Sequence, residues 1–285
     1  MITALLLLAA LTTPVTPDVV TDTVLQLDRG DRVVVTGLSG SVSIEGVAGS
    51  ELGVSTGRRT DRVAVRRSGG RVVVTAQARG GGRRPMDVSL RVPAWADVQV
   101  DGIDLDVSVR GGEGAVTIGT VEGDVRIEGT GGELRATTIE GEIVAEATRG
   151  PVVLSSHADD ITVSAPRGPV EAGTLDGDIR IVDAVSPSVR AETQSGDIDF
   201  AGAVLSGGAY RFYLHSGDAL LALPAELSAR VRVSTFHGDF ESDFPVMVSG
   251  FTSGRAFDFT VGGGDAEIVV EAFDGEIRLT REGGR

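Results

Sequence analysis

Glycine recurs at every ninth position through the middle of the chain, with one exception. The positions are Gly114, Gly123, Gly132, Gly141, Gly150, then Asp159 in place of glycine, then Gly168 and Gly177. An aliphatic residue follows two places after each of them: Val116, Val125, Leu134, Ile143, Val152, Ile161, Val170 and Ile179. A fixed period of this kind is typical of a chain that winds into coils, each of which buries its apolar side against the next.

The nine-residue units alternate between two kinds, so the structural repeat is eighteen residues. One kind carries acidic residues beside the glycine, as in Glu122-Gly-Asp-Val-Arg-Ile, and the other does not, as in Gly150-Pro-Val-Val-Leu. The spacing then grows to 19, 21 and 21 residues at the next glycines of the acidic kind: Gly196, Gly217 and Gly238. Gly275 lies 37 residues beyond Gly238, which we interpret as two further coils.

Apolar and polar residues alternate within each unit, as they do in a β-strand with one buried side. Stacked coils place equivalent positions about 4.8 Å apart. The predicted result is one buried aliphatic column: Val125, Ile143, Ile161, Ile179 and Ile198. We expect the corner glycines to supply the positive φ of a tight turn. Asp159 is a tolerated substitute in this interpretation, because Asp visits that backbone region more readily than most residues.

The composition favours an all-β fold, because Val and Ile dominate the apolar residues and amphipathic helical runs are almost absent. We predict a β-helix, or β-solenoid, with about 18–21 residues per coil over residues 96–285. Residues 18–95 contain β-rich runs such as Arg71-Val-Val-Val-Thr without the nine-residue period. We expect them to form an N-terminal β region that caps the solenoid, since an uncovered edge strand invites aggregation.

Residues 1–17 are predicted to be a signal peptide. The run from Ala4 to Leu11 is entirely apolar, and its length suits the core of a signal peptide but not a bilayer span. No Arg or Lys precedes it, so an apolar tail without a targeting role is the alternative. The prediction is an exported protein of the periplasm, cell surface or extracellular space, without a membrane span after signal removal.

Charge and cysteine content exclude several classes of function. The net charge of −15 argues against nucleic acid as a partner, because a phosphate backbone requires a basic surface. The absence of cysteine excludes disulfides, thiolate metal sites and cysteine nucleophiles. Nine arginines lie between Arg58 and Arg84. They are suited to anionic glycans or lipid headgroups, although a solvated strand face is the interpretation that we favour.

Several runs resemble a bacterial family in their order along the chain. They are Leu90-Arg-Val-Pro-Ala-Trp-Ala-Asp-Val-Gln-Val, the serial acidic-glycine units, Leu221-Ala-Leu-Pro-Ala-Glu-Leu-Ser-Ala-Arg-Val and Gly262-Gly-Gly-Asp-Ala-Glu-Ile-Val-Val-Glu-Ala-Phe-Asp-Gly-Glu-Ile-Arg-Leu. Together they resemble the putative-adhesin β-strand-repeat family, a domain of unknown function, over about residues 28 to 280. The resemblance implies an exported, single-stranded β-helix and supplies no catalytic residues.

Acidic residues beside the corner glycines form a predicted column. Its candidate metal-ligating members are Asp124, Glu142, Asp178, Asp197, Asp218 and Asp239. Like charges about 4.8 Å apart repel by about 0.9 kcal/mol even in water. Solvent, nearby arginines, backbone N–H groups of the turn or bound calcium would relieve this repulsion. We favour turn chemistry and keep calcium as the alternative, so no cofactor is predicted.

Aromatic residues and histidines supply the candidate binding surface. Eleven of the twelve aromatic residues lie between Phe200 and Phe273, where wider coils require larger fillers. An exposed subset would bind sugar or protein, and we name Tyr213, His215, His237 and Phe251 as candidates. His215 and His237 fall near successive corners, about one coil apart, so a metal or acid–base site is the alternative to solvated turn residues.

The sequence predicts a non-catalytic, adhesin-like protein of the cell envelope or surface, with a structural or interaction role. Its expected partner is a protein or glycan of the envelope, and its oligomeric state stays open. No Gly-x-Ser-x-Gly motif appears in a strand-to-helix context. The alternatives are a carbohydrate-active β-helix enzyme, which would need a walled groove with paired carboxylates, and a calcium-stabilised binding module.

Overall fold

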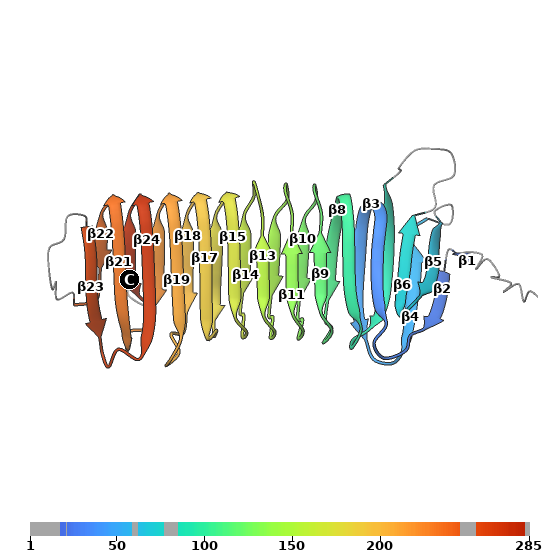
Figure 1. Ribbon diagram of the computed structural model, residues 1–285, viewed down its shortest axis with the longest axis horizontal. Helices are drawn as coiled ribbons and strands as arrows, with labels where there is room; N and C mark the ends of the chain where they lie inside the picture. Colours follow the sequence, from blue (N-terminus) through green and yellow to red (C-terminus); the bar gives the residue numbers. More distant parts are fainter. Residues whose placement is uncertain (1–17, 21, 59–61, 77–84, 246–254, 283–285) are drawn as a thin grey trace, which may run out of the picture.

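The computed structural model describes residues 18–20, 22–58, 62–76, 85–245 and 255–282. The predicted signal peptide therefore lies outside the described residues. The described chain is all-β, with twenty-five strands and no helix, and most of it forms an elongated stack of coils (Figure 1). The predicted β-solenoid with a preceding N-terminal β region is confirmed. No helix of the described residues has the length and hydropathy needed to cross a membrane.

Each coil contributes one strand to each of two facing layers. The first layer of the solenoid contains β9 (Val116–Gly119), β11 (Leu134–Thr137), β13 (Val152–Ser155), β15 (Val170–Asp176), β17 (Ser188–Ser195), β19 (Ala209–Ser216), β24 (Ala266–Asp274), β21 (Ala229–His237) and β23 (Arg255–Val261). The second contains β10 (Val125–Glu128), β12 (Ile143–Glu146), β14 (Ile161–Ser164), β16 (Ile179–Ala184), β18 (Ile198–Gly202), β20 (Ala219–Leu223), β25 (Ile277–Arg281) and β22 (Phe240–Ser242).

The predicted aliphatic column lies between these layers. Val125 pairs with Ile143, and the same register continues through Ile161, Ile179 and Ile198. Each of these side chains is at most 1% exposed. Burial contributes roughly 1.5–3 kcal/mol for each residue of this size, and no single coil encloses a core without its neighbours.

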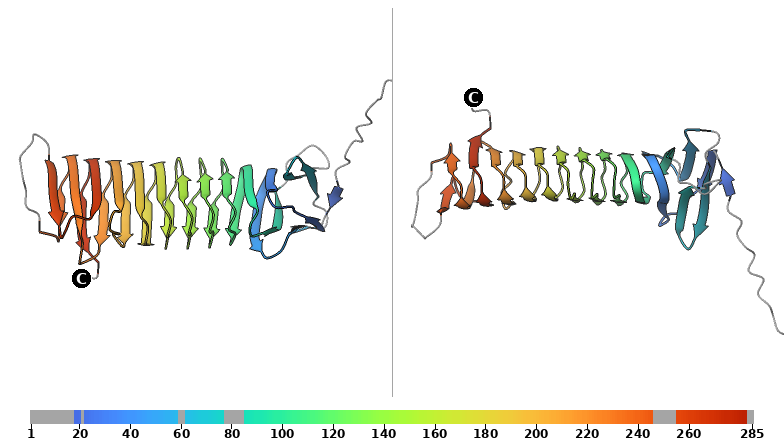
Figure 2. Two further views of the ribbon diagram at one scale, coloured as in Figure 1. Left: turned by 60° about the horizontal axis from the view of Figure 1, so that its bottom comes forward. Right: turned by 90° about the horizontal axis from the view of Figure 1, so that it is seen from above.

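The N-terminal region extends both layers and covers their edges. Two long strands, β3 (Arg32–Val47) and β8 (Asp97–Arg110), pair in parallel between Arg32–Glu45 and Asp97–Arg110, with register irregularities around Leu38. The other strands are β1 (Asp18–Val20), β2 (Asp22–Gln26), β4 (Glu51–Thr56), β5 (Val63–Ser68), β6 (Arg71–Ala76) and β7 (Met86–Pro93). β5 adds antiparallel to β6, and β4 adds antiparallel to β7, so the parallel stack ends in antiparallel strand pairs at one end of the molecule (Figure 2).

The order of the last coils differs from the order along the chain. β24 pairs in parallel with both β19 and β21, while β25 pairs with both β20 and β22. Because β23 runs back antiparallel along β21, the final coil lies between the two coils that precede it. The prediction that Gly275 lies two coils beyond Gly238 is therefore wrong. The spacing between two glycines gives the number of residues between them, but it does not determine which coils those residues stack against.

The corner glycines meet two requirements. Gly123, Gly141 and Gly177 have φ of 126°, 139° and 154°, as the predicted turn requires, and a Cβ on them would also lie 2.2–2.6 Å from a carbonyl oxygen of the neighbouring coil. Gly150 meets the second requirement alone, because a Cβ there would lie 2.1 Å from the carbonyl oxygen of Gly132. Asp159 does not adopt a positive φ, so its expected role as a left-handed substitute is wrong.

Candidate functional site

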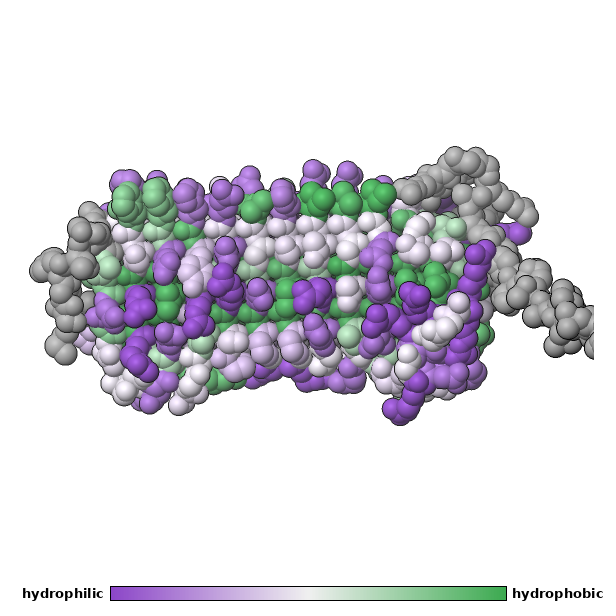
Figure 3. Space-filling view, viewed as in Figure 1, coloured by the Kyte–Doolittle hydropathy of each residue, from purple (hydrophilic) through white to green (hydrophobic). Residues whose placement is uncertain are grey.

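A row of outward side chains follows one corner of the solenoid, one residue from each coil (Figure 3, upper edge). We call this row the corner ridge. In stacking order its members are Ile103, Val121, Ile139, His157, Leu175, Gln194, His215, Phe273 and Phe236. Eight large hydrophobic side chains of the described residues are exposed, and six of them belong to this ridge. Since the interior is already filled by the inward columns, folding alone does not account for these exposed side chains.

The ridge ends in a stack of aromatic rings. His215 lies parallel to Phe273 with ring centroids 4.9 Å apart, and Phe273 lies parallel to Phe236 at 5.1 Å. His237 meets Phe236 edge-on at 4.5 Å. Phe273 thus has a ring stacked on each of its faces, whereas His215 and Phe236 each have one face stacked on Phe273. Phe236 and Phe273 remain 63% and 45% exposed.

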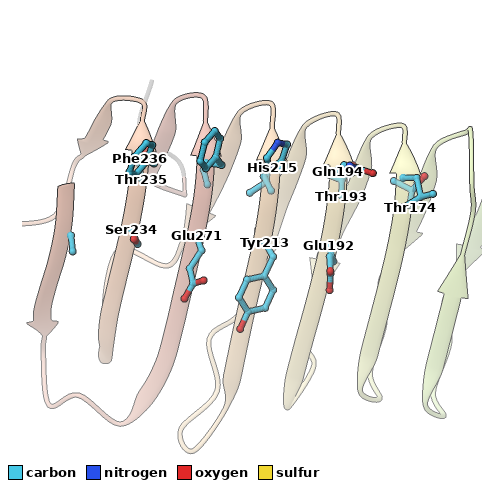
Figure 4. A pocket seen from close by; sticks show the side chains of 15 residues that line it. Thr174, Glu192, Thr193, Gln194, Tyr213, His215, Ser234, Thr235, Phe236 and Glu271 are labelled. Atoms are coloured by element: carbon cyan, nitrogen blue, oxygen red, sulfur yellow. The ribbon is translucent and has the colours of Figure 1, made fainter. Parts of the chain in front are cut away.

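An open groove of about 700 Å³ runs beside this aromatic stack (Figure 4). Strand alternation builds it, because residues on either side of a buried position both point outward. Its floor consists of Thr193, Leu214, Thr235 and Ala272, all buried. The ridge forms one wall, and the other wall consists of Glu192, Tyr213, Ser234 and Glu271. A neighbouring depression along β13 and β15 shares Thr174, Leu175 and Glu192 with it, so the groove continues across the coils.

Carboxylates border the groove and the ridge. Arg190 donates a hydrogen bond of 2.7 Å to Glu192 and lies 4.7 Å from the centre of the Tyr213 ring. The hydrogen bond to Glu192 is the main reason that the pKa of Arg190 is raised. On the far side of the ridge, an acidic residue directly follows several ridge residues: Asp104, Glu122, Glu140, Asp176 and Asp274. The apolar row therefore runs beside a row of negative charge.

The predicted acidic column exists, but its carboxylates join consecutive coils. Asp178 accepts the N–H of Asp197 at 2.8 Å, and Asp197 accepts the N–H of Asp218 at 2.7 Å. Glu276 follows Asp218 in the stack, ahead of Asp239. Asp124 likewise accepts the N–H of Glu142 at 3.1 Å. Within the described ranges, no group of three or more His, Asp or Glu side chains is arranged to hold a metal ion. Calcium binding stays the untested alternative.

The predicted binding residues are distributed along this corner. Tyr213 forms part of the groove wall, His215 belongs to the ridge, and His237 lies beside its last ring. Phe251 lies outside the described residues. The expectation that His215 and His237 lie one coil apart is wrong, because the coil that carries Phe273 is inserted between theirs.

The aliphatic part of the ridge was missed by the sequence analysis. Ile103 aside, its members precede an acidic residue and glycine, as in Val121-Glu-Gly, Ile139-Glu-Gly and Leu175-Asp-Gly, and the aromatic Phe273 does the same in Phe273-Asp-Gly. This signal was available in the sequence, at the same period as the core columns. The same units also carry the glycine and the inward aliphatic residue, so one period serves both the interior and the ridge.

The stacked parallel coils define a β-solenoid with a groove along one corner. Its C-terminal coils, residues 170–280, match the family described as Toastrack DUF4097. Over these residues the chain is similar to that family, and the family resemblance predicted from the sequence is confirmed there. No curated protein matches the chain.

Three solved structures are similar to the chain at low identity. A putative adhesin from Bacteroides fragilis has 10% identity and a TM-score of 0.40, with 92% of this chain and 97% of that chain covered. A putative lipid binding protein from Parabacteroides distasonis has 9% identity and a TM-score of 0.42, with 91% and 96% covered. A putative cell adhesion protein from Clostridium sporogenes has 8% identity and a TM-score of 0.28, with 94% and 100% covered.

Proposed function

We propose that the protein is a non-catalytic, adhesin-like interaction module, exported to the cell envelope or surface, that binds a partner along the corner ridge and its groove. The observation that carries the proposal is the ridge itself. Its nine positions, about 4.8 Å apart, extend over nearly 40 Å. Contiguous exposed apolar side chains with a polar border mark interaction sites on soluble proteins.

The scaffold suits this role because it holds the ridge rigidly. Every coil is joined to its neighbours by parallel strand pairing on both layers, and carboxylates such as Asp178 and Asp197 add bonds at the corner. A row that is ordered before binding loses little conformational entropy when a partner docks. The ridge is therefore prepared for an extended partner that crosses several coils.

We propose a protein of the envelope as this partner. A sugar ring packs on the open face of an aromatic ring, whereas Phe273 lies between His215 and Phe236 and has no open face. The remaining ridge residues are mainly aliphatic, as are the contacts in the cores of protein interfaces. Binding to a glycan is the other outcome that the experiment below distinguishes.

The test measures binding of the fluorescently labelled protein to an envelope fraction of the bacterium that produces it. The ridge variant replaces two exposed apolar residues, Leu175→Ser with Phe273→Ser. Its matched control replaces two others that lie off the ridge, Val24→Ser with Leu220→Ser. We expect the ridge variant to bind at least about tenfold more weakly, since each central contact contributes on the order of 1 kcal/mol or more.

Pretreatment of the envelope identifies the partner class. Protease should abolish binding, and periodate oxidation of sugars should leave it intact. Loss after periodate alone would replace the protein partner by a glycan. Equal losses in the ridge and control variants would show that the ridge is not the binding site.

A further inference from the structure

Charge is divided unequally between the two parts of the chain. Residues 18–95 contain 12 arginines and eight acidic residues, whereas residues 96–285 contain 14 arginines and 33 acidic residues. The N-terminal β region is thus basic on a protein whose net charge is −15. A charge asymmetry of this size indicates that the two ends face different surroundings.

Three of the four arginines at the hairpin of β5 and β6 have no ion-pair partner among the described residues. Arg66 and Arg71 are exposed and Arg62 is half-buried, and none of the three forms an ion pair or side-chain hydrogen bond with the described residues. Arg67 differs, because it pairs with Asp28 and with the buried Asp31. Arg59, Arg79, Arg83 and Arg84 of the same sequence cluster lie outside the described residues.

The three unpaired arginines belong to one outward side of β5 and β6. Arg62 and Arg66 are an even number of residues apart and project to the same side as Ser68, which lies opposite Arg71. Arg71 in turn pairs with Arg32 of β3, and the half-buried Val73 and Val34 lie beside them in the same register. We call Arg62, Arg66 and Arg71 the hairpin arginines. Neighbouring like charges repel, so an anionic surface would relieve a repulsion that the fold leaves uncompensated.

We propose that the hairpin arginines dock the protein on an anionic phospholipid bilayer. The hairpin arginines share one side of the β5–β6 pair, so they reach neighbouring headgroups of one surface together. Each basic residue in contact with an anionic leaflet contributes about 1 kcal/mol. The acidic coils weaken this attraction little, because most of their charge lies farther from the contact than the screening length of about 8 Å at physiological ionic strength. This docking is independent of the corner ridge.

The test is co-sedimentation of the full chain with vesicles of phosphatidylcholine alone or with about a third phosphatidylglycerol, at low and at about 0.5 M salt. The hairpin variant is Arg62→Gln, Arg66→Gln, Arg71→Gln. Its control, Arg126→Gln, Arg167→Gln, Arg230→Gln, removes the same charge from exposed solenoid arginines that also have no side-chain partner. Because none of these guanidinium groups has a partner, we expect both variants to retain the melting temperature of the unaltered protein.

The unaltered protein should bind the anionic vesicles, and high salt should release it. The hairpin variant should partition on the order of 100-fold more weakly, while the control and the Leu175→Ser, Phe273→Ser variant bind as the unaltered protein does. Absence of binding to anionic vesicles, equal binding to neutral vesicles or equal losses in both arginine variants would overturn the proposal. Equally tight binding of soluble polyphosphate would replace the bilayer by a polyanion.

Discussion

Glycine in the second kind of corner is set by space between coils. A Cβ on Gly132, Gly150 or Gly168 would lie 2.1–2.2 Å from a carbonyl oxygen of the coil below. Real Cβ atoms do not approach so closely, and backbone on both sides leaves little room to move. At the same corner, just after the strands of the second layer or at their end, Ala147, Ala165 and Asp183 adopt φ of 51–53°, so side chains are accepted where only the backbone angle is unusual. Close approach is thus the stricter requirement.

We therefore expect Gly150→Ala to lower the free energy of unfolding by about 1–3 kcal/mol, the cost of forcing atoms into a packed site. Gly173→Ala is the matched control, because the nearest atom to its Cβ would be 3.8 Å away and its φ is ordinary for any residue. Urea denaturation of both variants measures the difference. Equal stabilities would contradict the role assigned to Gly150.

At the scale of the corner element, side-chain carboxylates accept hydrogen bonds that strand pairing supplies elsewhere in the coil. The chain turns here, and backbone N–H groups that leave the ladder would lack partners within the protein. Asp106, Asp124, Asp160, Asp178, Asp197 and Asp218 each accept the N–H of the equivalent residue in the next coil. The expected repulsion between like charges is offset by these bonds, in which a charged acceptor strengthens the interaction.

Asp197→Ala should lower the free energy of unfolding by about 0.5–1.5 kcal/mol, because the N–H of Asp218 loses its acceptor at an exposed site. Asp197→Asn keeps the amide oxygen as an acceptor and should lose less. Because the carboxylates already have donors, addition of a chelator should leave the melting temperature of the unaltered protein unchanged. A fall on chelation would support the calcium alternative instead.

At the scale of the whole molecule, the inserted final coil connects the coil of β21 and β22 to the coil of β19 and β20. β24 and β25 contact coils on both sides, so the coil of β21 and β22 has no direct strand pairing with β19 or β20. The last two strands, β24 and β25, therefore lie inside the stack and not at its tip. The groove depends on this arrangement, because Glu271 and Phe273 come from the inserted strand.

A chain that ends after Gly264 tests the inserted order. It should also lose protease protection over β21 and β23, because these strands are then separated from the rest of the stack. Limited proteolysis with mass spectrometry of both chains gives the readout, and the coils before β19 serve as the internal control. Retained protection of β21 would mean that this coil restacks directly on β19.

The family resemblance and the interior of the solenoid were predictable from the sequence because both depend on local repetition. Val125, Ile143 and Ile161 occupy equivalent positions in successive repeats, and because each repeat winds in the same way, these residues align in the folded protein. The acidic column was predictable for the same reason. The candidate site was predictable in part: Tyr213 and His215 lie at it, while the aliphatic ridge was missed although its period is identical.

The amino-acid sequence was sufficient for the type of coil, its length and its core, because the eighteen-residue period is a property of adjacent segments. The stacking order of the last coils, and with it the contact of His215 with Phe273 in place of His237, was decided only in the folded molecule. Each strand of a parallel coil has two edges that can form hydrogen bonds, one toward the preceding coil and one toward the following coil. Because the repeats are so similar, more than one of them can pair with a given edge. Which segment fills the place next to β19 therefore depends on where β23 returns the chain, a contact between distant parts that no local period records.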